Sequence, residues 1–240
     1  MTDPIVIIGA TGGVGSALAA RLSGQGVALH LVARNGTALA AIAQRFGASH
    51  QVADCTDDAA LTAAVAAAGP RIAGVAYCVG SIVMKPLKRA SVEDFASTYA
   101  LNVIGAARAV AAAEAGLRAC EGSVVLFSSV AARAGFPNHA VIGTAKAAVE
   151  GLCVALAAEL APVRVNCIAP SLTRSKMAAG MTGNDAMARA LAAQHPVSRL
   201  GEPADGAALA AFLLSPDAGW ITGQVIGLDG GRATLRTRTS

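Results

Sequence analysis

A glycine-rich segment, GATGGVG at residues 9–15, is the first pattern in this chain that could do chemistry. It lies between a short apolar run at 5–8 and the helix-forming stretch SALAARL at 16–22. Glycine permits a tight turn, and it lets an anion approach the backbone amides at the start of a helix, where the helix dipole favours negative charge. Such a turn can also serve packing alone, but its place between a first strand and a helix favours a dinucleotide phosphate site.

Two further polar pairs follow the next apolar runs. Arg34 and Asn35 come directly after residues 28–33, where a site specific for NAD places an acid for the ribose hydroxyls and an arginine pairs with the 2′-phosphate of NADP. Arg34 therefore favours NADP(H), unless it is only a solvated loop residue. Asp54 and Cys55 end the third run, where the carboxylate either meets the adenine amino group or caps the next helix.

Strand-like and helix-like segments alternate along the whole chain. Short, mostly apolar runs predict seven strands, at 5–8, 28–33, 50–53, 74–79, 123–127, 163–169 and 224–228. Helices are predicted between them, at 13–23, 36–46, 57–67, 91–115, 140–160, 180–193 and 203–213. The alternation predicts a parallel, doubly wound α/β sheet, and strands this apolar are typical of a sheet covered on both faces. Such sheets bind ligands beyond the carboxyl ends of their strands, where the polar pairs lie.

Composition narrows the class of protein. The chain has 240 residues, of which 54% are hydrophobic, so one α/β domain is the economical interpretation. A net charge of +4 without a basic stripe, and only 3% aromatic residues, argue against a nucleic-acid partner. Five scattered cysteines predict neither a disulfide framework nor a metal site. Charged residues and glycines interrupt the apolar runs before the ~18 residues of a membrane span, and no signal peptide is evident, so a soluble cytoplasmic protein is expected.

More features follow in a recognisable order. They are a turn with Gly80, Asn102 in LNVIG, Ser128 and Ser129 after the fifth run, Lys146 in NHAVIGTAKAAVE, APSLT at 169–173, and WITGQVIGLDGG at 220–231. With the glycine segment, they make residues 3–231 resemble the short-chain dehydrogenase/reductase family. The resemblance implies a Rossmann-type domain over 1–231 with a seven-stranded sheet, followed by a basic tail at 232–240 that contains Arg232, Arg236 and Arg238. It also implies a nicotinamide cofactor and hydride transfer to or from a small carbonyl or alcohol.

The resemblance also implies roles for individual residues. Ser129 would orient the substrate oxygen, Lys146 would hold the nicotinamide ribose, and Asn102 would break its helix and anchor a water in the proton relay. Each residue has an ordinary structural alternative: a turn cap for the serines, a lysine reaching solvent, or an asparagine bonded to buried backbone. The cofactor contacts implied are Gly9, Thr11, Gly12, Gly13, Val14, Gly15, Arg34, Asn35, Asp54, Cys55, Cys78, Gly80, Lys146, Pro170, Leu172 and Thr173.

One position departs from the family in a way that bears on chemistry. Members carry a tyrosine four residues before the lysine, and its phenol donates the proton to the carbonyl oxygen; this chain has Ile142. The spacing of four places both side chains on one helix face, where a lysine lowers the pKa of a phenol. Isoleucine has no proton to give. There are three smaller departures from the family pattern. This chain has Tyr77-Cys78-Val79-Gly80 where members have Asn-Asn-Ala-Gly, Ser171 where they have the glycine of a Pro-Gly pair, and Ile8 where they have a threonine.

Loss of a positioned general acid costs roughly 10²–10⁴ in rate. His139, three residues before Ile142, is a candidate substitute because imidazole ordinarily titrates near neutral pH, although it could equally be a helix cap or a surface residue. Tyr99 and Tyr77 carry phenols nearby, but packing against the core is the simpler expectation for each. Ser129 or water could also supply the proton.

Two functions therefore stay open. The first is an NADP(H)-dependent reductase with an atypical proton supply, and the second is a catalytically silent nucleotide-binding sensor or partner subunit. Ser129, Lys146 and Asn102 favour the enzyme, and Ile142 favours the binder. As the resemblance implies, the chain could also form a homodimer or homotetramer through helices near 91–115 and 140–160, with either function.

The substrate would be set by residues 171–200, which the resemblance implies form a lid over the cleft. Met177, Met181 and Met187 in this segment could adapt to an apolar ligand or simply pack. Arg133 and Lys176 are candidates for binding an anionic end of the substrate.

Overall fold

The computed structural model describes residues 3–236, except for the side chains of residues 181 and 182. Met181 as a lid residue and Arg238 in the tail therefore lie outside what is described. The predicted seven-stranded sheet is confirmed. All its neighbouring strands are parallel, in the order β3-β2-β1-β4-β5-β6-β7. The strands are β1 (Ile5–Ile8), β2 (Leu29–Ala33), β3 (Ser49–Val52), β4 (Gly74–Tyr77), β5 (Ser123–Phe127), β6 (Arg164–Pro170) and β7 (Val225–Leu228).

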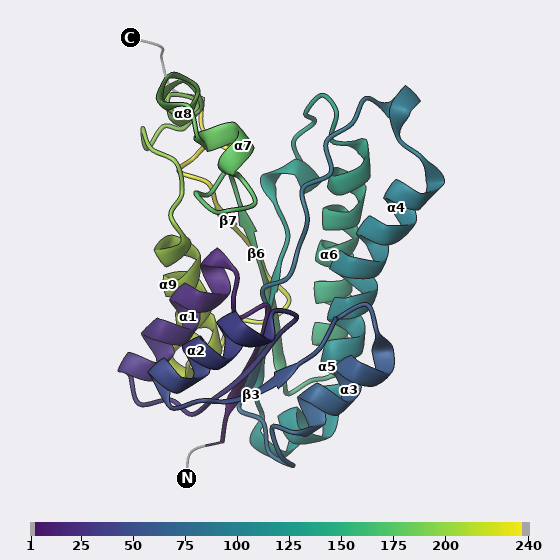
Figure 1. Ribbon diagram of the computed structural model, residues 1–240, viewed down its shortest axis with the longest axis vertical. Coiled ribbons are helices and arrows are strands. Elements are labelled where there is room, and N and C mark those ends of the chain that lie inside the picture. The colour runs from purple at the N-terminus through teal and green to yellow at the C-terminus, as the bar shows by residue number, and fades with distance from the viewer. Residues whose placement is uncertain (1–2, 237–240) are drawn as a thin grey trace.

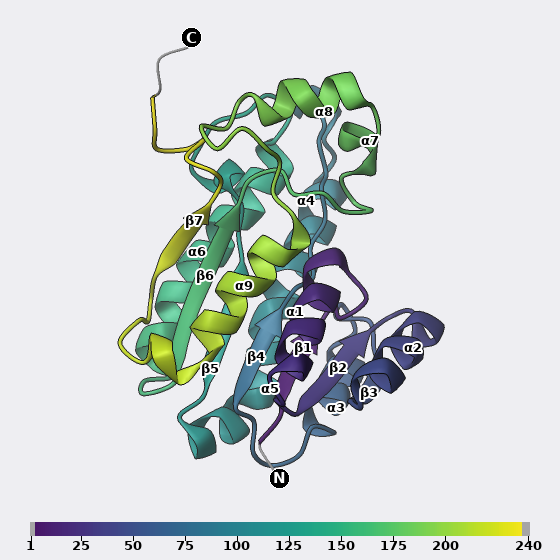
Figure 2. The ribbon, with the colours of Figure 1, turned by 90° about the vertical axis from the view of Figure 1, so that its left-hand side faces the viewer.

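Helices cover both faces of the sheet, as Figure 1 shows. One face carries α1 (Gly13–Gly24), α2 (Gly36–Phe46) and α9 (Pro203–Leu214). The other carries α3 (Asp58–Ala66), α4 (Val92–Tyr99), α5 (Gly105–Cys120) and α6 (Ala140–Glu159). Two short helices, α7 (Ala179–Thr182) and α8 (Asp185–Ala192), lie beyond the carboxyl ends of the strands (Figure 2). The domain is thus the doubly wound α/β fold that the alternating pattern predicts.

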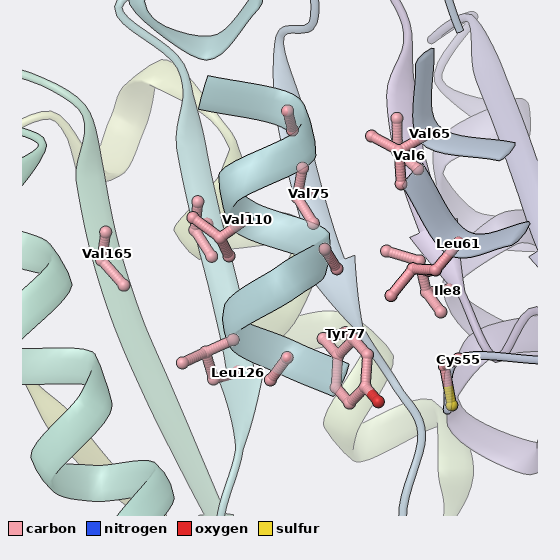
Figure 3. Close-up of a cluster of buried hydrophobic side chains, with 14 of the residues drawn as sticks. Val6, Ile8, Cys55, Leu61, Val65, Val75, Tyr77, Val110, Leu126 and Val165 are labelled. Carbon is pink, nitrogen blue, oxygen red and sulfur yellow. The ribbon is translucent and has the colours of Figure 1, made fainter. Parts of the chain in front are cut away.

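The core has two halves because successive side chains of a strand point to opposite faces. Val6 and Ile8 of β1 pack toward α3 and α5, together with Val75 and Tyr77 of β4 (Figure 3). Ile5 and Ile7 contribute to the other half, against α1, α2 and α9. Burial of each large aliphatic side chain stabilises the fold by about 1.5–3 kcal/mol. The two halves of the core together fix the position of the sheet, and with it the strand ends that carry the candidate site.

The edge strand β3 is an exception to the expected double coverage. All four of its residues, the polar sequence SHQV, are exposed. Among the described residues, β3 has a neighbouring strand on one side only. The prediction that every strand is covered on both faces is therefore wrong for β3.

Two predicted helices are interrupted. The segment predicted at 91–115 contains a π-helical turn, Ala100–Ile104, between α4 and α5. The segment predicted at 180–193 is divided by Asn184, whose side chain accepts hydrogen bonds from the amides of Ala186 and Met187 and so starts α8. Propensity alone did not locate these breaks, because alanine-rich sequence favours helix on both sides of each.

The helices at 92–120 and 140–159 are long and apolar enough, by length and composition, to cross a membrane. Glycines and charged residues nevertheless interrupt the apolar runs within both helices, as expected from the sequence. Both helices pack on the sheet, and residues of both contribute to its core. Their apolar character is accounted for by that packing and gives no evidence of a membrane.

Candidate active site

The glycine segment forms the turn between β1 and α1. Gly9 has φ +85°, a conformation that L side chains rarely adopt, and a Cβ on Gly15 would collide with the carbonyl oxygen of Gly9. Helix α1 begins at Gly13 with Gly12 as a cap that has no side chain, and its first turn contains no acidic residue. The first amides of α1 are therefore left without a side-chain acceptor, as a bound phosphate requires.

A cleft of about 800 Å³ opens beside this turn. Its walls come from the glycine turn, the segment after β4, the end of β5, the start of α6, the segment after β6 and Arg232. The structure brings most of the predicted residues together there: Thr11, Gly12, Gly13, Val14, Cys78, Gly80, Ser129, His139, Lys146, Pro170, Leu172 and Thr173. Gly9 and Gly15 support the turn from behind.

Lys146 lies in the cleft wall with its side chain pointing to the end of β5. Its Nζ donates to the carbonyl oxygen of Phe127 at 2.8 Å, and it forms no ion pair with any residue in the described part of the chain. The residue is only 7% exposed, and this burial lowers the pKa of Lys146 to about 8. The ammonium retains donors for further acceptors, because Lys has three N–H groups.

Ile142 lies one turn before Lys146 on α6 and lines the same cleft. It is 5% exposed and presents only an aliphatic surface. Ser129 lies across from α6 at the end of β5, where its Oγ accepts a hydrogen bond from the amide of Ala131 at 3.2 Å. That bond uses a lone pair of the hydroxyl and leaves its hydrogen available to a ligand oxygen.

His139 lines the cleft at the start of α6 but does not cap the helix through its side chain. Its Nδ1 lies 2.7 Å from the carbonyl oxygen of Pro137, so Nδ1 carries a hydrogen and donates. The ring packs against Phe136, with 5.4 Å between centroids. Nε2 is the ring nitrogen left to exchange a proton with a ligand or water.

Asn102 lies in the π-helical turn, consistent with the local helix break expected there. Its Nδ2 donates to the carbonyl oxygen of Thr98 at 2.9 Å and to Ser81 Oγ at 3.2 Å. Its Oδ1 is buried and has no partner among the described residues. A Cβ built on Gly80 would lie 3.3 Å from both this oxygen and Lys146 Nζ, so both polar groups lie close to Gly80. A buried acceptor of this kind calls for a donor such as water.

Ser128 and Arg133 belong to a structural network. Ser128 Oγ lies 3.0 Å from both the carbonyl oxygen of Lys146 and Oε1 of Glu150. Arg133 Nε donates to Glu150 Oε2 at 2.7 Å. Arg133 is therefore paired with Glu150 and is absent from the cleft lining, which removes it as a candidate for an anionic substrate.

The residues predicted around the adenosine lie apart from the cleft, beyond β2 and β3. Arg34 is 71% exposed and lies 3.5 Å from Asp54 in a weak surface pair. Asn35 caps α2 by accepting from the amide of Ala38. Asp54 does not cap α3, because Asp57 does so; Asp54 accepts instead from the amide and hydroxyl of Thr56, bonds that lower the pKa of Asp54. Cys55 is buried, and burial raises the pKa of its thiol.

Neither tyrosine reaches the cleft. Tyr77 is 2% exposed and donates to the carbonyl oxygen of Leu101 at 2.6 Å, and burial raises its pKa far above the usual range. The expectation of core packing is confirmed for Tyr77. The same expectation is wrong for Tyr99, which is 45% exposed at the end of α4.

Sequence analysis missed a set of polar residues on the far wall. Arg232 lines the cleft although it was assigned to the tail, and His195 lies behind it, with Nε2 at 2.9 Å from Ser171 Oγ. Gly230 and Gly231, with φ +60° and +87°, turn the chain after β7 back toward the cleft. The glycine pair directly before Arg232 was the feature of the sequence that could have indicated that this arginine turns back toward the cleft.

The fold and the cleft define a doubly wound α/β domain with a nucleotide-type site at the carboxyl edge of its sheet. Residues 9–233 match the family model described as Enoyl-(Acyl carrier protein) reductase. A short-chain type dehydrogenase/reductase from Mycobacterium ulcerans is similar in structure, with a TM-score of 0.92 and 31% identity, covering 98% of this chain and 92% of that one.

Two relatives are similar over most of their length. The protein named inactive 2-(S)-hydroxypropyl-CoM dehydrogenase 2 of Xanthobacter autotrophicus is 36% identical over 224 residues, 88% of this chain and 96% of its own. Galactitol 2-dehydrogenase (L-tagatose-forming) of Cereibacter sphaeroides is 34% identical, over 94% of this chain and 92% of its own. The chain belongs to the short-chain dehydrogenase/reductase family of oxidoreductases, as the sequence motifs indicate.

Proposed function

We propose that the protein is an NADP(H)-dependent oxidoreductase that transfers hydride between the nicotinamide and a small carbonyl or alcohol substrate. The observation that carries the proposal is that the uncapped start of α1, Lys146 and Ser129 share one cleft. The glycine turn accepts a pyrophosphate without a side-chain obstacle, and Lys146 Nζ retains donors for ribose hydroxyls. When bound, a nicotinamide nucleotide supplies or accepts the hydride.

This chain's own residues supply orientation and proton transfer. Ser129 Oγ donates to the substrate oxygen and fixes its position in the cleft. Asn102 Oδ1 and Lys146 Nζ, which both lie close to Gly80, hold a water that connects the ribose side of the cleft to solvent. Ile142 stands at the family's tyrosine position, so the proton reaches the substrate oxygen from another group. His139 is the favoured donor because its Nε2 is uncommitted and it lines the cleft.

Arg34 supports NADP(H) over NAD(H). It follows β2, and its pairing with Asp54 at 3.5 Å is exposed and therefore weak. The guanidinium can leave this carboxylate for a 2′-phosphate at little cost.

A catalytically silent nucleotide-binding protein is the second candidate, and the observation in its favour is the aliphatic wall at Ile142. One relative carries the word inactive in its name. Oxidation of NADPH in the presence of small ketones and quinones decides between the two. Measurable turnover that requires Lys146 supports the enzyme, and tight NADPH binding without turnover supports the silent protein.

We also propose that the protein acts in the cytoplasm as a homodimer or homotetramer. Exposed apolar side chains on α4, the π-helical turn and α6 support an interface there: Val92, Tyr99, Ile104 and Val154. Light scattering tests the assembly, and a monomer at micromolar concentration would contradict it.

A further inference from the structure

The lining of the cleft is positively charged, and the nearby carboxylate of Asp229 lies beyond ion-pair distance of Arg232. Lys146, Lys176 and Arg232 line the cleft, and none of the described lining residues is Asp or Glu. Lys146 and the glycine turn are explained by the nucleotide under the proposed function. Arg232 lies on the wall with Phe136, the ring against which His139 packs, and so faces the part of the cleft left for the substrate.

Arg232 is held in a fixed orientation. Its guanidinium carbon lies 4.9 Å from the centroid of the Phe136 ring. Nη1 lies 3.3 Å from Ser171 Oγ, and Nη2 donates to Gln194 Oε1 at 2.6 Å. A guanidinium stacked on a ring and bonded at two nitrogens has little rotational freedom.

The network behind Arg232 has a consistent set of hydrogen positions. His195 Nδ1 lies 2.9 Å from the carbonyl oxygen of Leu191, so Nδ1 carries a hydrogen. In the neutral ring Nε2 is then an acceptor and takes the hydroxyl hydrogen of Ser171. The oxygen of Ser171 is left to accept from Arg232. Each donor in this network therefore meets an acceptor, and His195 and Ser171 position Arg232.

Arg232 has hydrogen-bonding capacity left over. A guanidinium has five N–H groups, of which these contacts use two, so three remain. Arg232 also has no carboxylate within ion-pair distance among the described residues, whereas Arg133 is paired with Glu150. A planar fork of this kind matches a carboxylate better than any neutral group does.

We propose that Arg232 anchors a carboxylate on the substrate, which is therefore a small oxo acid or hydroxy acid. This inference rests on the proposed function in taking the cleft as the substrate pocket. The carboxylate binds at the fork of Arg232, and the carbon skeleton lies along Phe136 and Ile142. The apolar remainder of the wall selects a short hydrocarbon chain rather than a sugar.

The test uses unreactive probes and the full-length protein saturated with NADPH, whose reduced ring adds no positive charge. Butanoate, pentanoate and hexanoate are each compared with the corresponding amide by calorimetric titration at neutral pH. We expect at least one acid to bind about tenfold or more tightly than its amide, since a charge-assisted pair outweighs a neutral hydrogen bond. Arg232→Gln removes this preference, and Arg232→Lys, which keeps the charge without the fork, reduces it several-fold.

Two matched variants locate the effect. Arg236→Gln removes an exposed guanidinium from the same segment, outside the cleft, and is expected to keep the preference. Lys176→Gln removes the other cation of the substrate side and is also expected to keep most of it. A wild type that binds acid and amide equally overturns the proposal, whether or not Arg232→Gln folds. A preference that persists in Arg232→Gln, or that disappears in Lys176→Gln instead, overturns it as well.

The two proposals fail separately. NADPH binding is measured by the fluorescence of the nucleotide, and its absence contradicts the proposed function. The affinities for acid and amide are measured by calorimetry, in the nucleotide-free protein if NADPH does not bind. Equal affinities for the two contradict the carboxylate site.

Discussion

Ile142 precedes Lys146 by one turn of α6, and both side chains lie in the wall of one cleft. The lysine is buried and forms no ion pair among the described residues, and the isoleucine one turn before it offers no proton. This relationship separates two properties that the family usually combines, the holding of a nucleotide and the donation of a proton.

Replacing Ile142 by tyrosine should restore a proton donor. In His139→Gln, which removes the substitute donor, we predict that the further change Ile142→Tyr raises kcat for ketone reduction by roughly 10²-fold or more, because a positioned general acid contributes about 10²–10⁴. Ile142→Phe is the matched control, with the same ring and no hydroxyl, and should give no gain. Steady-state NADPH oxidation measures both. Equal rates in the two variants would rule out the phenol as the missing group, and activity confined to Ile142→Tyr would favour the silent wild type.

His139 should carry the proton in the wild type if that protein turns over. We predict that His139→Gln lowers kcat by about 10²-fold or more and leaves NADPH affinity unchanged, since the imidazole lines the cleft from the start of α6 and is not part of the glycine turn. His50→Gln, at an exposed position on β3, is the control. A rate in His139→Gln equal to that of the wild type would exclude this donor and leave Ser129 or water.

Arg34 should determine the choice of nucleotide. We predict that Arg34→Leu weakens NADPH binding by about 10- to 100-fold and changes NADH binding little, because a charge-assisted bond to the 2′-phosphate contributes about 1.5–3 kcal/mol. Arg21→Leu, at the opposite end of α1 from the glycine turn, is the control. Fluorescence titrations with both nucleotides measure the ratio, and equal losses for the two would contradict a phosphate contact.

Lys146 should make the stability of the nucleotide-free protein depend on pH. Burial lowers its pKa from 10.5 to about 8, so the folded state disfavours the charged form. Below pH 8 the wild type should therefore be less stable than Lys146→Met, by no more than about 3 kcal/mol at 1.36 kcal/mol per pKa unit. Between pH 8 and 10.5 the lysine of the folded protein loses its proton before that of the unfolded chain. The difference in the free energy of unfolding between the two proteins, the stability gap, should therefore close over this range.

Urea unfolding of the two proteins at a series of pH values measures this gap. Subtracting the curves cancels the titration of all other groups. A gap that stays constant, or widens as the pH rises, would show that the ammonium is better solvated or paired than its surroundings indicate.

The sheet could be predicted from sequence because its strands are short apolar runs between alanine-rich helices. Strand bounds such as 5–8 and 123–127 agree with the structure, since each run ends where glycine or serine begins the next turn. The exposure of β3 could not be read in the same way, because it depends on the position of that strand at the edge of the sheet.

The site was predictable where local pattern determines geometry and unpredictable where long-range packing does. The glycine turn and the α6 face follow from spacing within one element. Arg232 reaches the cleft only because Gly230 and Gly231 reverse the chain. Ser171 bonds Arg232 across 61 residues of sequence and His195 across 24. Asp57 rather than Asp54 caps α3 because it directly precedes the first residue of the helix, Asp58.

Titration of the protein with NADPH tests the central claim most directly, with Lys146→Met measured beside the wild type. We predict saturable binding by the wild type and a loss of affinity of about tenfold or more in the variant, as expected if the ammonium at the end of β5 holds the ribose. A wild type that binds neither NADPH nor NADH would contradict the account.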